Sequence, residues 1–289
     1  MTESYSSENS NLLNPDNISI RDNCLDKSWL ENCFRRFGGY PDLEQLWKLV
    51  DEVWIEFGCD KNLNEANLSV FYSHPVWLLN GLFIEQDQAS LSNRQCFVNY
   101  AVNQAPVRVA DIGGGFGTLA RMIGTACPQA QIEIIEPHPH PEAIHRTEAL
   151  ANVKYCPQLS GNYDLLIATD VFEHVPDPIA LVEATASHLK LGGKYLIANC
   201  FYPVILCHLP QTLHFRYSWN EVLAALGLKP EKQIAYGYEF TRELGGSIER
   251  ARFLEQRSQK IFKWFDSLPI NRGKTRIGSL VFSALSSLP

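Results

Sequence analysis

The stretch from Val107 to Ala120 constrains the fold of this chain more than any other. It begins as an apolar run with β-branched residues, ends in a group of glycines, and continues with apolar residues at helical spacing. This change of period predicts a buried strand, a tight turn and the first turn of a helix. Glycine accepts positive φ and lets a ligand approach the backbone, and a helix N-terminus directs unpaired N–H groups at that ligand.

Beyond this stretch, predicted strands alternate with predicted helices, which indicates an α/β fold with a doubly wound, mostly parallel sheet. Seven strands are expected, over residues 107–112, 131–135, 153–155, 163–169, 194–198, 232–238 and 277–285. A long amphipathic helix is expected over residues 247–268.

The chain is expected to divide into three parts. Residues 1–24 are rich in Ser, Asn, Asp and Glu, which predicts a flexible tail. Residues 25–105 carry apolar side chains at helical spacing and predict a helical cap, while residues 106–289 form the sheet domain. Polar residues interleaved in the cap either belong to its core or reach a bound ligand: Tyr72, His74 and Arg94.

Composition excludes several classes of function. The net charge of −7 and the lack of a Lys/Arg run argue against non-specific nucleic-acid binding, which requires neutralised phosphates. No apolar stretch approaches the roughly 20 residues of a membrane helix, and the polar N-terminus is unlike a secretory signal. The eight cysteines are scattered, which is typical of reduced thiols in a cytoplasmic protein.

Acidic residues follow three of the predicted strands. In an open α/β sheet, ligands bind outside the carboxyl ends of the strands, where Asp111, Glu136 and Asp170 are expected. A carboxylate at Glu136, roughly 20 residues past the glycines, is suited to the hydroxyls of a ribose. The pattern therefore indicates a nucleoside ligand but leaves its identity open between a nicotinamide dinucleotide and another nucleoside.

The spacing of the loop glycines separates the two ligand classes. In the dinucleotide pattern G-x-G-x-x-G, Gly113 and Gly115 fit, but the third glycine is replaced by Thr118. The pattern Asp-x-Gly-x-Gly-x-Gly is matched in full by Asp111, Gly113, Gly115 and Gly117.

Three motifs together carry a family resemblance. The glycine pattern, the segment 168–178 with its Glu-His-Val, and the segment 189–197 with its Leu-Lys-Leu-Gly-Gly resemble class I S-adenosylmethionine-dependent methyltransferases of the ubiquinone and menaquinone biosynthesis group. The resemblance covers about residues 107–228, and Leu191 stands where proline is usual. It implies a Rossmann-like fold and S-adenosylmethionine as cofactor.

The resemblance also implies roles for individual residues. The methionine part of the cofactor is expected on Asp111 and the loop glycines, and the ribose on Glu136. The sulfonium is expected beside the residues that follow strand four. The implied cofactor-binding residues are Asp111, Gly113, Gly114, Gly115, Gly117, Glu136, Asp170, Val171 and Phe172.

The acceptor side is expected near His174 and the segment 199–217, which is too apolar for an ordinary surface loop. His174 either acts as a general base or holds the strand-four turn. His208 and His214, with Tyr202 nearby, either contact the acceptor or cap the loop. Arg216 either binds an anionic acceptor group or pairs with a structural acid.

The histidines at positions 138, 140 and 145 lack acidic or cysteine partners at ligand spacing, so no metal site is predicted. The function favoured is methyl transfer to a small organic acceptor, first to a hydroxyl or carboxylate oxygen. A nicotinamide-dependent oxidoreductase and a catalytically silent cofactor-binding protein are the alternatives. Acceptor identity and oligomeric state are not determined by the sequence.

Overall fold

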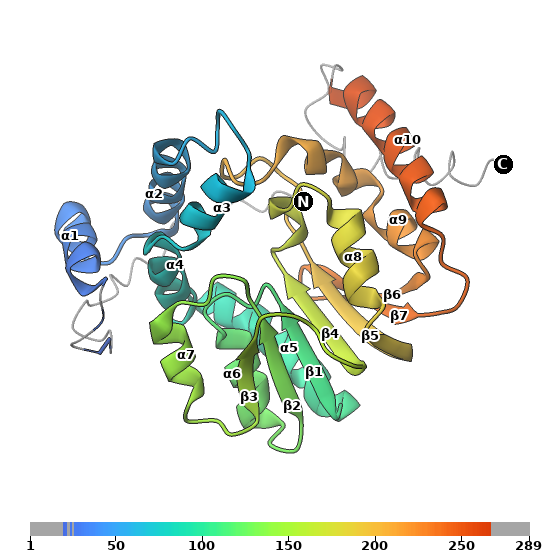
Figure 1. Ribbon diagram of the computed structural model, residues 1–289, viewed down its shortest axis with the longest axis horizontal. Helices are drawn as coiled ribbons and strands as arrows, with labels where there is room; N and C mark the ends of the chain where they lie inside the picture. The colour runs from blue at the N-terminus through green and yellow to red at the C-terminus, as the bar shows by residue number, and fades with distance from the viewer. Residues whose placement is uncertain (1–19, 22–23, 25, 267–289) are drawn as a thin grey trace.

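A seven-stranded sheet forms the centre of the described part of the chain, which in this computed structural model is residues 20, 21, 24 and 26–266 (Figure 1). The strand order is β3-β2-β1-β4-β5-β7-β6, and β7 runs antiparallel to both of its neighbours. The strands are β1 (Arg108–Ile112), β2 (Gln131–Ile135), β3 (Val153–Cys156), β4 (Tyr163–Thr169), β5 (Leu189–Ala198), β6 (Leu228–Ile234) and β7 (Gly237–Arg242).

Helices cover both faces of this sheet. They are α5 (Gln88–Gln104), α6 (Thr118–Ala126), α7 (Pro141–Thr147), α8 (Pro178–Ala186), α9 (Trp219–Ala225) and α10 (Ile248–Asp266). Successive strand residues point to opposite faces. Ala110 and Ala168 therefore pack in one cluster with α8, α9 and α10, while Val109 and Ile167 pack in another with α5 and α6. Burial on both faces explains the nearly continuous apolar strands and confirms the expected fold class.

The order of the strands places a crevice between β1 and β4. The chain passes from β1 to β2 and β3 on one side, then returns to β4 on the other side of β1. The two central strands are in parallel register, with Ile112 opposite Ala168. Their carboxyl ends therefore lie side by side at the switch point where such sheets bind ligands.

Two expected strands differ from the structure. The strand expected over 232–238 is a hairpin of β6 and β7, whose two-residue turn is Ala235 (φ 48°) and Tyr236. Neither residue is typical of such a turn, where Asn-Gly or Asp-Gly is usual, so the sequence pattern hid it. The strand expected over 277–285 lies outside the described residues, and β7 supplies the seventh strand of the described sheet.

The N-terminal helices build a hydrophobic cluster of their own, which we call the cap. They are α1 (Lys27–Phe37), α2 (Leu43–Glu56), α3 (Glu65–Tyr72) and α4 (Val76–Ile84), which lie together on one side of the sheet (Figure 1). Their cluster includes Leu46, Trp54 and Phe71, and it extends to Phe116 of the glycine loop and to Cys207. The cap is therefore packed against the loop that follows β1.

Polar contacts hold the end of α4 against the sheet domain. The Glu85 carboxylate accepts hydrogen bonds from Thr118 and Arg121 of α6 and from Arg146 of α7, the last at 2.5 Å. The Arg146 guanidinium also lies 5.0 Å from the centre of the Phe116 ring. This network joins the cap to the first turn after the glycine loop.

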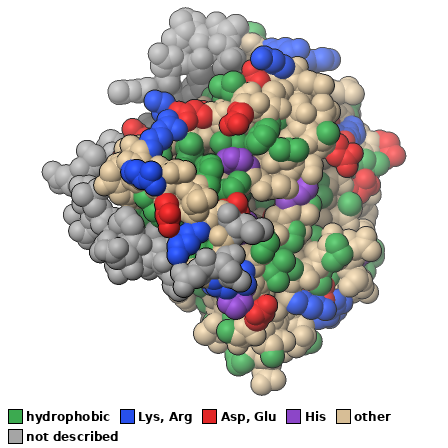
Figure 2. All heavy atoms as spheres, turned by 60° about the vertical axis from the view of Figure 1, so that its left-hand side comes forward, with side chains coloured by type: hydrophobic (Ala, Val, Ile, Leu, Met, Phe, Trp, Pro, Cys, Tyr) green, Lys and Arg blue, Asp and Glu red, His purple; other side chains and the backbone are tan. Residues whose placement is uncertain are grey.

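Two further features of the structure are the hydropathy of the helices and the distribution of charge on one face of the molecule. No helix in the described part of the chain has the length and apolar character needed to cross a membrane. On the face that Figure 2 shows, Lys and Arg side chains lie beside Asp and Glu, and histidines lie among hydrophobic side chains. That face carries no extended patch of a single sign.

Gly81 of α4 tests the fit between cap and loop. A Cβ at this position would lie 2.4 Å from Cβ and Cγ of Phe116. Alanine favours a helix by about 1 kcal/mol over glycine, but overpacking costs about 1–3 kcal/mol. We expect Gly81→Ala to lower the free energy of unfolding by about 1–2 kcal/mol in denaturant titrations. The matched control Asn80→Ala adds no atom and should not lower it; a stabilised Gly81→Ala would contradict this contact.

Candidate functional site

The glycine loop between β1 and α6 has the bare, left-handed backbone that its sequence predicts. Gly113, Gly115 and Gly117 have φ values of 63°, 51° and 74°. A Cβ at Gly113 would lie 2.7 Å from a Val171 methyl group, so the loop packs closely against the residues after β4. A side chain at any of the three positions would be strained in its backbone, and at Gly113 and Gly117 it would also be crowded by neighbouring atoms.

The Asp111 side chain is buried beneath this loop. The residue is 2% exposed, and neither carboxylate oxygen makes a hydrogen bond within the described residues. A Cβ at Gly114 would lie 2.8 Å from Asp111 Oδ2, which places the carboxylate directly against the loop backbone. Burial raises the pKa of Asp111 to about 7, and the Arg94 guanidinium opposes that rise. A buried carboxyl without a hydrogen-bond partner is costly, so this position is suited to a cationic or hydrogen-bond-donating group of a ligand.

Glu136 follows β2 and lies at the same edge of the sheet. Its carboxylate accepts hydrogen bonds from the backbone N–H groups of Gly115 and His138, both at 3.0 Å. Tyr72 of the cap lies nearby with its hydroxyl buried and unpaired within the described residues. Burial raises the pKa of Tyr72, and the Cys207, Glu136 and Glu173 side chains raise it further. Tyr72 packs in the cap cluster with its hydroxyl near Glu136 and Glu173, and its contact with a ligand stays a prediction.

Asp170 follows β4 in a left-handed conformation with φ 54°. Its Oδ2 accepts a 2.7 Å hydrogen bond from the hydroxyl of Tyr236, in the turn between β6 and β7. Arg94 of α5 interacts electrostatically with both Asp111 and Asp170 and donates to the Ser90 carbonyl. The structure therefore places Arg94 at the carboxyl ends of β1 and β4.

The two residues after Asp170 face different surroundings. Val171 lies over Gly113, in the loop contact described above. The Phe172 ring is fully buried in the core, 5.4 Å from Trp219 and 6.4 Å from Tyr195 between ring centres. Their expected place beside a sulfonium stays a prediction, and for Phe172 it concerns the backbone because the ring points into the core.

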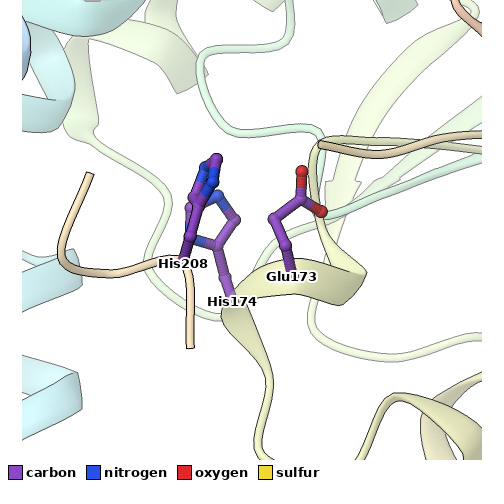
Figure 3. Close-up of side chains that lie close together, drawn as sticks. All are labelled: Glu173, His174 and His208. Atoms are coloured by element: carbon purple, nitrogen blue, oxygen red, sulfur yellow. The ribbon is translucent and has the colours of Figure 1, made fainter. Parts of the chain in front are cut away.

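Glu173, His174 and His208 form a cluster next to these residues (Figure 3). The two imidazole centres are 4.8 Å apart. Nδ1 of His174 lies 3.1 Å from the Cys207 carbonyl, and Nδ1 of His208 lies 2.6 Å from the Tyr202 carbonyl. Burial lowers the pKa of His174 to about 3 and also lowers that of His208. Both imidazoles are neutral at physiological pH, and His174 is a weak proton acceptor.

The Glu173 carboxyl was not assigned a role from the sequence. It is fully buried, and burial followed by the nearby Asp170 carboxylate raises its pKa well above the ordinary range. Its neighbour His174 in the Glu-His-Val motif was the available signal. Tyr236 and the unpaired indole N–H of Trp77 were also missed, because nothing in their sequence surroundings points to the strand ends.

Other sequence candidates have partners away from this cluster. Nδ1 of His214 lies 3.0 Å from the Ser258 hydroxyl of α10. His74 accepts from the Val76 N–H and stacks edge-on against Trp29, within the cap. Within the described residues, neither joins Glu173, His174 and His208.

The remaining acceptor-side candidates contact each other. The Arg216 side chain donates to the Leu213 carbonyl, and its guanidinium lies 4.7 Å from the Tyr202 ring centre and 5.0 Å from that of Phe262. Tyr202 is 42% exposed, and its carbonyl accepts from His208. Arg216 is thus connected to the histidine cluster only through Tyr202, whose ring it contacts and whose carbonyl lies next to His208. Its role toward an anionic acceptor stays a prediction.

The chain matches the family model described as a methyltransferase domain over residues 83–260, which is more than half of its length. It is 30% identical over 114 residues to a ubiquinone biosynthesis O-methyltransferase of Xanthomonas axonopodis pv. citri, covering 36% of this chain and 47% of the relative. An enzyme of the same name from Marinobacter nauticus is 26% identical over 114 residues, covering 36% and 48%. The match thus spans about half the length of these relatives.

Solved structures show similar folds at low identity. The mitomycin 7-O-methyltransferase MmcR aligns with a TM-score of 0.48 and 15% identity, over 70% of this chain and 69% of that one. The N-methyltransferase NodS from Bradyrhizobium japonicum, in complex with S-adenosyl-L-homocysteine, aligns with a TM-score of 0.42 and 13% identity, over 54% and 88%.

The buried Asp111 predicts a pH dependence. Its pKa is raised from 3.8 to about 7, so the folded chain keeps a proton that the unfolded chain loses between those values. The ligand-free protein should therefore lose stability as pH rises through this window, by as much as about 4 kcal/mol from this group. Asp111→Asn should flatten that part of the curve and stabilise the protein at pH 8.

The measurement is the free energy of unfolding against pH for both proteins, without ligand. Asp60→Asn, at an exposed position, is the matched control and should leave the curve unchanged. Parallel curves for the parent and Asp111→Asn would show that the Asp111 carboxyl is not desolvated as the structure indicates.

Proposed function

Since the chain belongs to the methyltransferase domain family, as its three motifs predicted, we propose that it transfers a methyl group to an oxygen of a small organic acceptor. The family confirms the enzyme class and S-adenosylmethionine as the cofactor. The oxidoreductase alternative is not favoured by these matches. Transfer to oxygen is supported by the names of the relatives, which are O-methyltransferases.

One observation carries the proposal: the unpaired, buried carboxylate of Asp111 against a glycine loop. An ammonium group such as that of a bound amino acid would satisfy this carboxylate, and loop N–H groups would bind the accompanying polar atoms. Arg94, which interacts with Asp111 and Asp170, is positioned for the carboxylate of the same amino acid. The residues present therefore fit the methionine part of S-adenosylmethionine.

The nucleoside part fits Glu136. Its carboxylate is held by two backbone N–H groups at the end of β2, where it can accept hydrogen bonds from ribose hydroxyls. A Cβ at Gly115 would have no protein atom within 4 Å. A ligand can therefore approach the bare backbone of Gly115 closely. When bound, the cofactor supplies an electrophilic methyl group on a sulfonium, and the protein aligns the acceptor and excludes water.

The acceptor side lies between the cap and the segment 199–217. The Tyr72 hydroxyl, the Trp77 indole N–H and the Nε2 atoms of His174 and His208 are polar groups in otherwise apolar and aromatic surroundings. Such a lining suits a small organic molecule with an apolar body and a few oxygens.

The same packing suggests where the acceptor-side unit ends. Phe97 and Ala101 of α5 pack with β1 and β2 in the sheet core, whereas α1–α4 have their own cluster. We place the boundary before α5 and not at residue 105. A cytoplasmic location is part of this proposal and rests on eight free cysteines, three of them buried.

Binding of the cofactor tests the strand-end residues. We expect Glu136→Ala to weaken binding of S-adenosylmethionine by about tenfold to a hundredfold in calorimetry, because a charged acceptor of ribose hydroxyls is lost. The control Glu148→Ala removes an exposed carboxylate that pairs with His145 on the far end of α7. Equal affinities for the parent and Glu136→Ala would exclude Glu136 from the nucleoside site.

Release of S-adenosylhomocysteine tests the acceptor class. The protein should release it with at least one member of a panel of phenols and carboxylic acids, and not with matched amines. Asp111→Asn should abolish the signal at cofactor concentrations near the Kd of the parent. Tight cofactor binding without release across the panel would favour the catalytically silent alternative, and release with amines alone would overturn oxygen as the acceptor atom.

A further inference from the structure

The cluster of Glu173, His174 and His208 unites two distant parts of the chain. Glu173 and His174 lie in the 3₁₀ turn after β4 (η2, Phe172–His174), and His208 comes from the segment after β5. One side-chain ligand atom from each lies within 4.8 Å of the others. Figure 3 shows the two imidazoles side by side, with the carboxylate next to them.

Backbone carbonyls determine which ring nitrogen of each histidine is free. A carbonyl oxygen only accepts hydrogen bonds, so Nδ1 of His174 carries the hydrogen that it donates to Cys207. Nδ1 of His208 likewise donates to the carbonyl of Tyr202. The lone pair of each ring is therefore on Nε2. A carbonyl behind the other nitrogen is the usual arrangement for a histidine that binds a metal ion.

The carboxylate completes the set and is itself unsatisfied. Oε1 of Glu173 accepts a 2.7 Å hydrogen bond from the Cys200 N–H, which orients the group. Oε2 is buried and has no hydrogen-bond partner within the described residues, although the residue is 0% exposed. Buried acidic oxygens are normally paired or bound to a cation.

We propose that Glu173, His174 and His208 bind one divalent transition-metal ion of the zinc class. Two imidazole nitrogens and one carboxylate oxygen are a common three-residue zinc set that leaves a fourth position open. Ligand atoms around such an ion lie about 3.3 Å apart, given bond lengths of about 2.0–2.1 Å. Since the ligand atoms all lie within 4.8 Å, binding draws the widest pair together by at most roughly 1.5 Å.

The types of ligand atom favour a transition-metal ion over Ca²⁺ or Mg²⁺. Ca²⁺ and Mg²⁺ prefer sets made of oxygen ligands, whereas imidazole suits zinc, iron, nickel and copper. No thiolate takes part, since the Cys207 side chain belongs to the hydrophobic cluster of the cap. The histidine-rich segment after β2 is not an alternative, because His140 pairs with Asp26 and His145 with Glu148.

The open position suggests how the ion acts, and this step rests on the proposed function. Trp77 of the cap stands edge-on to His174 at 6.5 Å, so the acceptor side adjoins the cluster. An acceptor hydroxyl bound to the ion loses its proton to solvent more readily. Its oxygen then forms the new O–CH₃ bond while the S–CH₃ bond breaks and its electron pair returns to sulfur. The products are the methylated oxygen and S-adenosylhomocysteine.

The test is zinc binding to the full, tag-free chain. Metal analysis after equilibration with Zn²⁺ and dialysis should give about one ion per chain. In competition with a chromophoric chelator, Glu173→Gln and His208→Asn should each weaken binding by more than about a hundredfold, since even changes behind the ligands cost about 10- to 100-fold. His145→Ala, which removes an exposed histidine, is the matched control and should keep the parent affinity.

Circular dichroism establishes that each variant is folded, and the visible absorption of bound Co²⁺ reports a tetrahedral site in the parent that both ligand variants should lose. A parent chain that holds no stoichiometric zinc, or ligand variants that bind it as tightly as the parent, would overturn the proposal. Calorimetry with S-adenosylmethionine on the same samples separates the two claims. Cofactor binding without zinc binding defeats only the metal site, and zinc binding without cofactor binding defeats only the proposed function.

Discussion

The desolvation of carboxyl groups where parallel strands end is the constraint on which the rest of the structure depends. Asp111 lies near the end of β1, and Asp170 directly follows the neighbouring parallel strand β4, so the sheet brings their carboxyl groups to one crevice. Asp111 is buried there without a hydrogen bond from the described residues. In the proposed function a bound cofactor would offset this cost, so the same unsatisfied carboxylate would contribute to the affinity for the ligand.

The cap is tied to that crevice through the glycine loop. Phe116 of the loop packs against Gly81, and Glu85 binds the first turn of α6 and Arg146 in the last turn of α7. The glycine loop is thereby held by side chains from a separate cluster. This packing also brings Trp77 to 6.5 Å from His174 between ring centres, and in the proposed function the cap supplies the acceptor side.

The histidines show how surroundings and not residue type decide function. His174 and His208 are held through Nδ1 by backbone carbonyls, and both lie in one cluster with the buried Glu173 carboxylate. His214 is equally buried but hydrogen-bonds a serine on α10, and His74 begins a helix in the cap. From the sequence, His174, His208 and His214 were equally good candidates for the acceptor side. Spacing along the chain carries no information about which backbone carbonyl each ring contacts.

The sequence by itself determined the sheet, the glycine loop and the acids at the strand ends, because these follow from local period and from backbone that only glycine accommodates. Tertiary structure alone decided the β6–β7 hairpin, the partnership of Tyr236 with Asp170, and the meeting of Glu173 with His208. The last two contacts join residues 66 and 35 positions apart in the sequence, where no periodicity restricts the path of the chain. Packing between the cap and the sheet selects that path, and packing is a property of the whole fold.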